Sequence, residues 1–554
     1  MDTMHTYTNP VYPGFHPDPS VIRVGTDFYM VNSTFHYYPG IVISHSRDLV
    51  HWRPLGHVWT RSDWLDIRGL MDGRGFWAPD ISYHNGLFYI FVTLRLNEIQ
   101  QDGSPAPLVR RQMIVTSPKP EGPYSYPRFI DVDGIDPSHF VDEDGKHYML
   151  LNPGVRLIPL TDDCSAVAGE IKTIWEGSGG RIPEGPHLLK KDGWYYLLTA
   201  EGGTGYGHQI GSGRSRSLYG PYENNPHNPI LKQNDPESPL QRCGHGKFVE
   251  APDGSWWVLY LCGRPVSAYP VNLEADRFCI LGRETALDPV QWTDDGWPII
   301  NEKKGPSLVN RAPNLPWSPF PEKNRDDFEA AHLDIRWYTP RNPDLSAYSL
   351  TERPGHLRLY CRSANLNELT AHPLLQRETS LVSEAICLME FNPQSHGEEA
   401  GLTLYYDTKT HIKFGRRRKG NTWYLFVEDQ RGVGYIPVAE RAECLIPESQ
   451  ERAPGQESLT IPQGNTNQTV PSSQLYLTIL TRALERRFLY SYDGVHWEEL
   501  VTISDCYHLS DEGYQGPHSK RFTGTMVGIF AYNGGSCSTT PADFDWFEYI
   551  PQEK

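Results

Sequence analysis

Short apolar and aromatic runs, each followed by a turn signal, succeed one another along the first half of the chain. Examples are residues 28–33, 88–93, 195–199 and 256–260. Asn-Gly or Asp-Gly pairs stand beside such runs at residues 85–86, 144–145, 192–193 and 253–254. Runs this short are typical of β-strands, and these pairs are typical of hairpin turns. Long helical periodicity is almost absent, so we expect an all-β fold.

A glycine leading into an aromatic-rich strand recurs five times in this half. The five glycines are Gly25, Gly86, Gly145, Gly193 and Gly254. Repeats of this kind predict a β-propeller, here with five blades of four strands. The units are longer than ordinary propeller repeats, so we expect functional loops between the strands.

The repeat stops near residue 302, and a different β pattern begins at residue 326. We therefore assign residues 1–302 to the propeller, residues 303–325 to a Pro-rich linker and residues 326–554 to a β-sandwich. Strands of the sandwich are expected at residues 356–361, 401–406, 422–428, 475–481 and 526–532, with a hairpin turn at 493–494. The polar stretch 446–474 is expected to form a long exposed loop.

Composition narrows the function without fixing it. Lys and Arg number 51 against 68 Asp and Glu, a net charge of −17, which disfavours nucleic acid or an anionic membrane as a partner. We find neither an apolar run of membrane-spanning length nor a signal peptide, so we expect a cytoplasmic protein. The nine cysteines are odd in number and form neither a CxxC pair nor a cluster with zinc-ligand spacing, which favours reduced buried thiols.

One polar residue stands at nearly the same distance upstream of four of the repeated glycines. These residues are Asp18, Asp136, Glu184 and His245, whereas the second unit has Pro79 there. The start of each innermost strand opens onto the centre of a propeller, so three carboxyl groups should meet. Burial and mutual repulsion would separate their pKa values, as glycosidic bond cleavage requires. A single acid here would more simply cap a turn, but Asp-Pro-Ser occurs twice, at 18–20 and 136–138, which favours the functional interpretation.

The second unit supplies an aromatic wall in place of an acid. Trp77 should lie at the rim of the centre, where sugar rings stack on aromatic side chains, and Asp80 should be a structural hydrogen-bonding residue. Phe35 fits equally well as a second sugar platform or as a core residue.

The ordered motifs NPVYPGFHPDPS at 9–20, WAPD at 77–80, GIDPS at 134–138, EGPH at 184–187 and LGRET at 281–285 resemble glycoside hydrolase family 43. The resemblance covers nearly the whole chain and is closest to β-xylosidases and α-L-arabinofuranosidases. It implies a five-bladed propeller followed by a concanavalin-like jelly roll, and hydrolysis that inverts the anomeric centre. It also implies that Asp18 is the general base, Glu184 the general acid and Asp136 the residue that raises the pKa of the acid and positions it.

The same resemblance implies roles for three further residues. Arg283 would hydrogen-bond the hydroxyls of the non-reducing sugar, although most arginines form surface or interblade salt bridges. His245 would lie near a hydrated calcium ion in the channel, or would simply hydrogen-bond water there; no cofactor is required for catalysis. Phe522, in the sandwich, would close the pocket and make the enzyme exo-acting.

We therefore expect an inverting exo-glycosidase that releases terminal pentose from xylo- or arabino-oligosaccharides, foremost a β-1,4-xylosidase. An enzyme that acts mainly as an α-L-arabinofuranosidase is the first alternative. A retaining hydrolase of the sucrose type lacks its expected motifs here, and a non-catalytic carbohydrate-binding scaffold is disfavoured by the complete set of carboxyl groups. The resemblance further implies a homo-oligomer.

Overall fold

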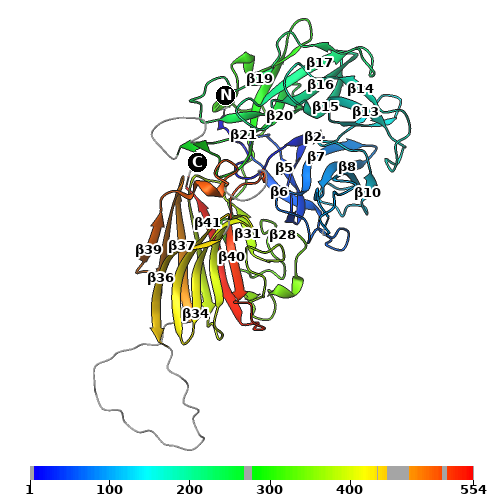
Figure 1. Cartoon of the computed structure of the whole chain (residues 1–554). Coiled ribbons are helices and arrows are strands. Elements are labelled where there is room, and N and C mark those ends of the chain that lie inside the picture. The colour runs from blue at the N-terminus through cyan, green and yellow to red at the C-terminus, as the bar shows by residue number, and fades with distance from the viewer. Residues whose placement is uncertain are drawn as a thin grey trace, which may run out of the picture.

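The structure is a computed structural model that describes residues 5–100, 102–267, 277–432, 434–445, 473–514 and 521–552. The chain forms two lobes, and its regular structure is almost entirely β (Figure 1). The first lobe runs from blue to green in Figure 1 and the second from yellow to red. No described helix is long and apolar enough to cross a membrane.

The first lobe contains five antiparallel sheets among the described residues, which we call blades one to five in chain order. Blade one consists of β2 (Ser20–Val24), β3 (Asp27–Asn32), β5 (Gly40–Ser46) and β6 (Arg53–Trp59). Blade two consists of β7 (Gly75–His84), β8 (Leu87–Arg95), β9 (Arg110–Ser117) and β10 (Arg128–Ile130). Blade three consists of β11 (Ser138–Val141), β12 (His147–Leu151), β13 (Val155–Pro159) and β14 (Lys172–Trp175). Blade four consists of β15 (Glu184–Lys191), β16 (Trp194–Glu201), β17 (Gln209–Ser215), β18 (Glu223–Asn224) and β19 (Leu231–Lys232). Blade five consists of β20 (Gln241–Glu250), β21 (Trp256–Gly263), β24 (Glu284–Trp292) and β25 (Pro298–Ile300).

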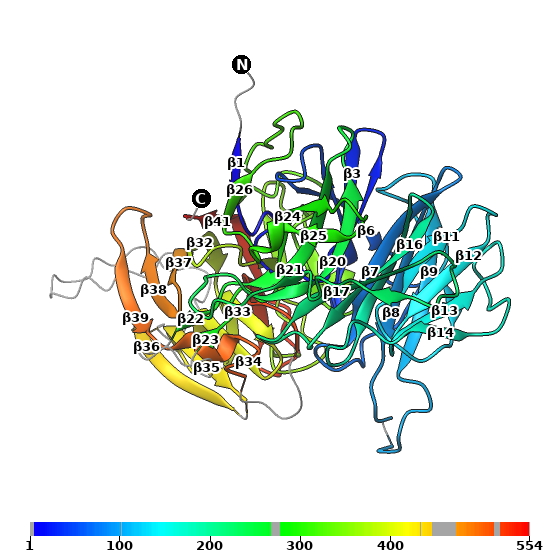
Figure 2. The ribbon, with the colours of Figure 1, turned by 90° about the horizontal axis from the view of Figure 1, so that it is seen from above.

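The blades close into a ring. The first strand of each blade contacts the first strand of the next, in the order β2, β7, β11, β15 and β20, and β20 contacts β2 again. These strands therefore surround a common centre, as in a β-propeller, and the view from above shows the blades beside the second lobe (Figure 2).

Local sequence explains the shape of each blade. In the hairpin β7–β8, His84 pairs with Leu87 across Asn85-Gly86, whose φ angles of 47° and 80° are those of a type I′ turn. The strand β8 is buried along almost its whole length, because a neighbouring blade covers each of its faces. Its continuous apolar sequence follows from this burial on both faces.

The second lobe is a sandwich of two antiparallel sheets. One sheet contains β29 (Tyr348–Ser349), β30 (Leu357–Tyr360), β41 (Pro541–Pro551), β32 (Val382–Phe391), β37 (Gln474–Arg482), β38 (Glu485–Ser491) and β39 (Glu498–Ile503), with β27 (Arg325–Asp326) on β41. The other contains β31 (Leu374–Arg377), β40 (Met526–Asn533), β33 (Glu398–Asp407), β34 (Thr410–Lys419), β35 (Thr422–Arg431) and β36 (Tyr435–Leu445). Side chains such as Leu402, Phe488 and Phe544 form the core between the sheets. The prediction of a propeller followed by a sandwich is confirmed. The long loop is expected at residues 446–474, of which residues 446–472 lie outside the described residues.

Short elements connect the lobes. The pair that joins propeller to sandwich is β4 (Tyr37–Tyr38) with β28 (Thr339–Pro340). Two further pairs, β1 (Thr6–Thr8) with β26 (Val309–Arg311) and β22 (Val266–Ser267) with β23 (Arg277–Phe278), lie within the propeller and the linker. Within the described residues, 3₁₀ turns span Asn301–Lys303, Leu345–Ala347 and Cys506–Leu509. An aromatic cluster that includes Phe15 and Phe35 of the propeller and Tyr405 and Phe530 of the sandwich is shared by the two lobes. The domain boundaries given above stay predictions.

Candidate active site

All eight side chains singled out from the sequence line one pocket at the centre of the propeller, which encloses about 480 Å³. They are Asp18, Phe35, Trp77, Asp136, Glu184, His245, Arg283 and Phe522.

The backbone adopts the same unusual conformation at three of the four repeat positions. Asp18 and Asp136 precede β2 and β11, and His245 lies in β20, yet their φ angles are 53°, 58° and 51°. This left-handed conformation is uncommon for residues other than glycine and costs about 1–3 kcal/mol at each position. Three equivalent strained positions around one pocket indicate that their side chains are held there for a function.

Asp18 is surrounded by groups that favour its charged form. Arg283 Nη1 donates a hydrogen bond of 2.8 Å to Asp18 Oδ1, and Ser33 Oγ donates one of 2.6 Å to Asp18 Oδ2. His245 Nδ1 lies 3.9 Å from Asp18 Oδ1. Burial alone would raise the pKa of Asp18, but Arg283, His245 and Ser33 outweigh it and lower the pKa below its usual value.

The other two carboxyl groups have the opposite electrostatics. Burial, together with the negative charge of Asp18, raises the pKa of Glu184 to about 7. Burial, Glu184 and Asp18 raise the pKa of Asp136, although the Gly185 amide donates to Asp136 Oδ2 at 3.0 Å. Consequently Asp18 is ionised at neutral pH, whereas Glu184 and Asp136 together retain a proton.

Aromatic side chains form one wall of the pocket. The rings of Phe35 and Trp77 lie 6.1 Å apart, and those of Trp77 and Phe522 lie 5.7 Å apart, between centroids. Trp77 is fixed by a hydrogen bond of 2.9 Å from its Nε1 to the carbonyl of Gly73. Phe35 both lines the pocket and packs in a core cluster, and its role as a sugar platform stays a prediction.

The sandwich contributes main-chain groups as well as the Phe522 ring. The Phe522 amide donates to Asp511 Oδ1 at 2.9 Å, and the backbone adopts φ 62°. The Phe522 carbonyl accepts a hydrogen bond of 3.2 Å from Arg283 Nη2. Arg283 is therefore held between Asp18 of the propeller and a carbonyl of the sandwich.

Two polar residues of the pocket were missed from the sequence. His208 Nε2 and Thr204 Oγ1 are buried without a hydrogen-bond partner in the described part of the chain. Burial lowers the pKa of His208 to about 3, and its Nδ1 lies 3.0 Å from the Arg242 carbonyl, so Nε2 carries a lone pair. The only feature of the sequence that could have indicated Thr204 and His208 is the glycine-rich stretch 202–207.

The groups beside His245 do not fit a calcium ion. Lys247 Nζ lies 2.6 Å from Asp80 Oδ1, 2.8 Å from the Ile81 carbonyl and 3.0 Å from Ser20 Oγ. The ammonium group therefore takes the oxygens that a cation would need, whereas calcium prefers six to eight of them. These contacts also agree with the structural role expected for Asp80.

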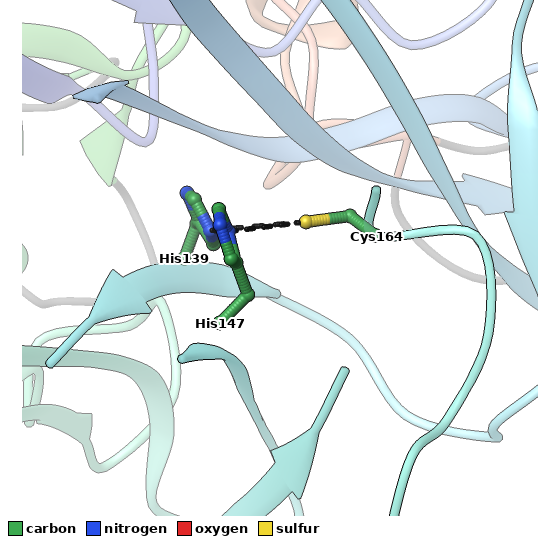
Figure 3. Close-up of side chains that lie close together, drawn as sticks. All are labelled: His139, His147 and Cys164. Atoms are coloured by element: carbon green, nitrogen blue, oxygen red, sulfur yellow. Dashed lines mark hydrogen bonds between the residues drawn. The ribbon is translucent and has the colours of Figure 1, made fainter. Parts of the chain in front are cut away.

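A second group of ligand-type side chains lies in and beside blade three, where the sequence spacing gave no indication of it (Figure 3). His147 Nδ1 lies 2.9 Å from His139 Nε2 and 3.3 Å from Cys164 Sγ. On its other side, His139 Nδ1 lies 2.6 Å from Ser82 Oγ. Because these groups satisfy one another, hydrogen bonding explains the cluster without an ion. Among the described cysteines none forms a disulfide, and only Cys537 is exposed.

Comparisons with known proteins agree with this geometry. The family described as glycosyl hydrolases family 43 matches residues 7–298, and the β-xylosidase C-terminal concanavalin A-like domain matches residues 325–550. The chain is 35% identical to xylosidase/arabinosidase 43B of Humicola insolens, over 98% of this chain and 97% of that protein. The crystal structure of the GH43 BlXynB protein from Bacillus licheniformis is 50% identical with a TM-score of 0.89, covering 99% of this chain and all (100%) of that one. Xylan β-1,4-xylosidase from Bacillus halodurans C-125 is 35% identical with a TM-score of 0.85, covering 98% and 100%.

Proposed function

We propose that this chain, which belongs to glycosyl hydrolases family 43, is an inverting β-1,4-xylosidase that removes single xylose residues from the non-reducing ends of xylo-oligosaccharides. The observation that carries the proposal is the opposite pKa shift of two carboxyl groups, Asp18 and Glu184, in one pocket. An ionised carboxylate and a protonated one are the two groups that hydrolysis of a glycosidic bond needs.

Asp18 would act as the general base. Its low pKa keeps it ionised, and its oxygens face the pocket between Arg283 and His245. A water molecule held between Asp18 and the anomeric carbon would lose its proton to the carboxylate as it attacks. Arg283 would then keep Asp18 in place and bind sugar hydroxyls with its remaining donors.

Glu184 would act as the general acid. With a pKa of about 7 it still holds a proton at the pH where Asp18 is ionised, and it would give that proton to the departing oxygen. Asp136 shares the same buried environment and would hold the proton within the pair and fix its position. No metal enters these steps.

The pocket geometry supports exo action. Phe522 of the sandwich packs against Trp77 and extends the aromatic wall, so the sugar would enter a site that is closed on that side. The unpartnered His208 Nε2 and Thr204 Oγ1 would accept and donate hydrogen bonds to hydroxyls of the terminal sugar. A polymer could not pass through such a site, whereas the end of a short chain could enter it.

α-L-Arabinofuranosidase activity is the second candidate, because the relative from Humicola insolens is named a xylosidase/arabinosidase and one from Bacteroides ovatus a non-reducing end α-L-arabinofuranosidase. The discriminating experiment measures kcat/KM on nitrophenyl β-xyloside, α-L-arabinofuranoside and β-galactoside. The β-xyloside should be the best substrate, and NMR should show α-xylose as the first product. A β-xylose first product would contradict inversion, and turnover confined to the arabinofuranoside would reverse the order of the two activities. The homo-oligomer and the cytoplasmic location stay predictions.

A further inference from the structure

A second pocket lies where the propeller, the segment 323–324 and the sandwich meet, and we call it the rear pocket. It holds about 710 Å³ of space between its walls, the open solvent at its entrance included. Its lining comes from three residues of the propeller, from segment 323–324 and from seven residues further along the chain, namely Tyr12, His16, Pro54, Lys323, Asn324, Arg336, Tyr338, Gln376, Arg377, Thr379, Tyr549 and Pro551. Only a short stretch of chain separates His16 from Asp18, so this pocket lies behind the wall of the active site.

Arg377 gives the rear pocket its unusual electrostatics. The residue is only 8% exposed, and its Nε donates a hydrogen bond of 2.6 Å to the Phe15 carbonyl. Its guanidinium stacks on Tyr338 at 4.3 Å from the ring centroid. Neither of its two Nη groups has a hydrogen-bond or ion-pair partner in the described residues. Buried charges in proteins are normally paired, so an unpaired guanidinium that lines a cavity indicates an absent anionic ligand.

Further donors line the same cavity. Gln376 is 4% exposed, and its Nε2 has no hydrogen-bond partner among the described residues. Arg336 Nη2 is also buried without a hydrogen-bond partner among them. Lys323 adds a charge at the mouth. The described lining contains no acidic residue, and the adjacent Asp334 is already bound to Lys323 and Arg336. This concentration of positive charge stands out in a chain with a net charge of −17.

We propose that the rear pocket binds a small organic oxyanion, a carboxylate or phosphate group carried by a molecule of about sugar size. The two Nη groups of Arg377 form the fork that grips such a group with two parallel hydrogen bonds. Gln376 Nε2 and Arg336 Nη2 lie just beneath the cavity surface, and a small side-chain shift on binding brings them to its remaining oxygens. The rings of Tyr12 and Tyr338 contact the carbon frame of the ligand.

Isothermal titration calorimetry with the full-length protein tests the proposal. The probes are D-glucuronate, inorganic phosphate and, as the uncharged match of the first, D-glucose. We expect at least one of the two anions to bind and glucose not to bind. Tighter binding of glucuronate assigns a sugar carboxylate, and tighter binding of phosphate assigns a phosphate ester. Failure of both anions to bind at millimolar concentrations would overturn the proposal.

Matched variants locate the binding site. Arg377→Gln should weaken anion binding by about ten-fold or more, because it removes a charge-assisted pair of hydrogen bonds. Arg283→Gln removes the guanidinium of the active-site pocket and should leave anion binding unchanged. The reverse result would assign the anion to the active site and refute the rear pocket.

A second variant protects the test against loss of folding. Gln376→Leu removes an amide whose nitrogen is buried without a partner, so the unliganded variant should unfold at the temperature of the wild type or above it. Its affinity for the anion should nevertheless fall several-fold. Unchanged affinity in both Gln376→Leu and Arg377→Gln would contradict the proposed contacts.

Discussion

Replacing Glu184 by Gln should stabilise the protein above neutral pH, while it abolishes acid catalysis. Burial and the charge of Asp18 raise the pKa of Glu184 from 4.5 to about 7 in the folded state. The folded protein thus holds this proton more tightly than the unfolded chain, so the stabilisation is complete below pH 4.5 and is lost as pH rises through about 7. The shift corresponds to about 3 kcal/mol at 1.36 kcal/mol per pKa unit, of which about 2.5 kcal/mol falls between pH 5 and pH 8. A glutamine is always neutral and does not suffer this loss.

The assay is urea unfolding of the wild type and of Glu184→Gln at pH 5, 6.5 and 8, followed by tryptophan fluorescence. The difference in unfolding free energy between the two proteins should grow steadily in favour of the variant. Glu170→Gln, at a carboxylate whose side chain is 76% exposed, is the matched control and should show a difference that does not change with pH. A constant difference for Glu184→Gln as well would show that the carboxyl is not held protonated, and the assignment of the acid would fail.

Other consequences can be measured in steady-state kinetics. Asp18→Ala should lose about 10³-fold or more in kcat on every aryl xyloside, whereas Glu184→Ala should recover most of its rate on substrates with good leaving groups; equal losses on both substrate types would contradict the roles. For the wild type, kcat/KM should fall as pH rises through about 7, since Glu184 then loses its proton, and a profile that stays flat to pH 9 would oppose this. Phe522→Ala should raise KM several-fold with a smaller change in kcat, and an unchanged KM would remove Phe522 from the sugar site. Chelation by EDTA should leave activity unchanged, because Lys247 occupies the channel oxygens, and a loss restored by calcium would refute that interpretation.

The sequence predicted the carboxyl groups because the propeller repeats one structural position. Asp18 and Asp136 precede the first strand of their blades, and Glu184 begins the first strand of blade four. Because these positions correspond in the repeats, comparison of the repeats predicts that the three carboxyl groups lie together. The comparison of the repeats predicts Trp77 at the rim and the family resemblance implies Arg283, and the structure places both at the same pocket. The assigned catalytic roles go beyond placement and stay predictions.

Contacts between distant segments could not be derived from the repeat. Lys247 reaches Asp80 because β20 carries two register shifts, between Gln241 and Gly244 and between Gly244 and Lys247, which no alternation pattern reveals. Similarly, His208 lies at the edge of a glycine-rich stretch without periodicity. The free guanidinium of Arg377 depends on which carboxylates are absent around it, which only the assembled fold determines.

The hydrogen bond from Arg283 to the Phe522 carbonyl has an evolutionary consequence. The arginine that steadies Asp18 comes from one domain and its carbonyl partner from the other. Gene shuffling that replaced the sandwich would discard a main-chain atom of the active site, and no side-chain mutation in the propeller would restore it. The position of Arg283 therefore depends on both domains, and a propeller joined to an unrelated second domain would leave this guanidinium without its main-chain acceptor.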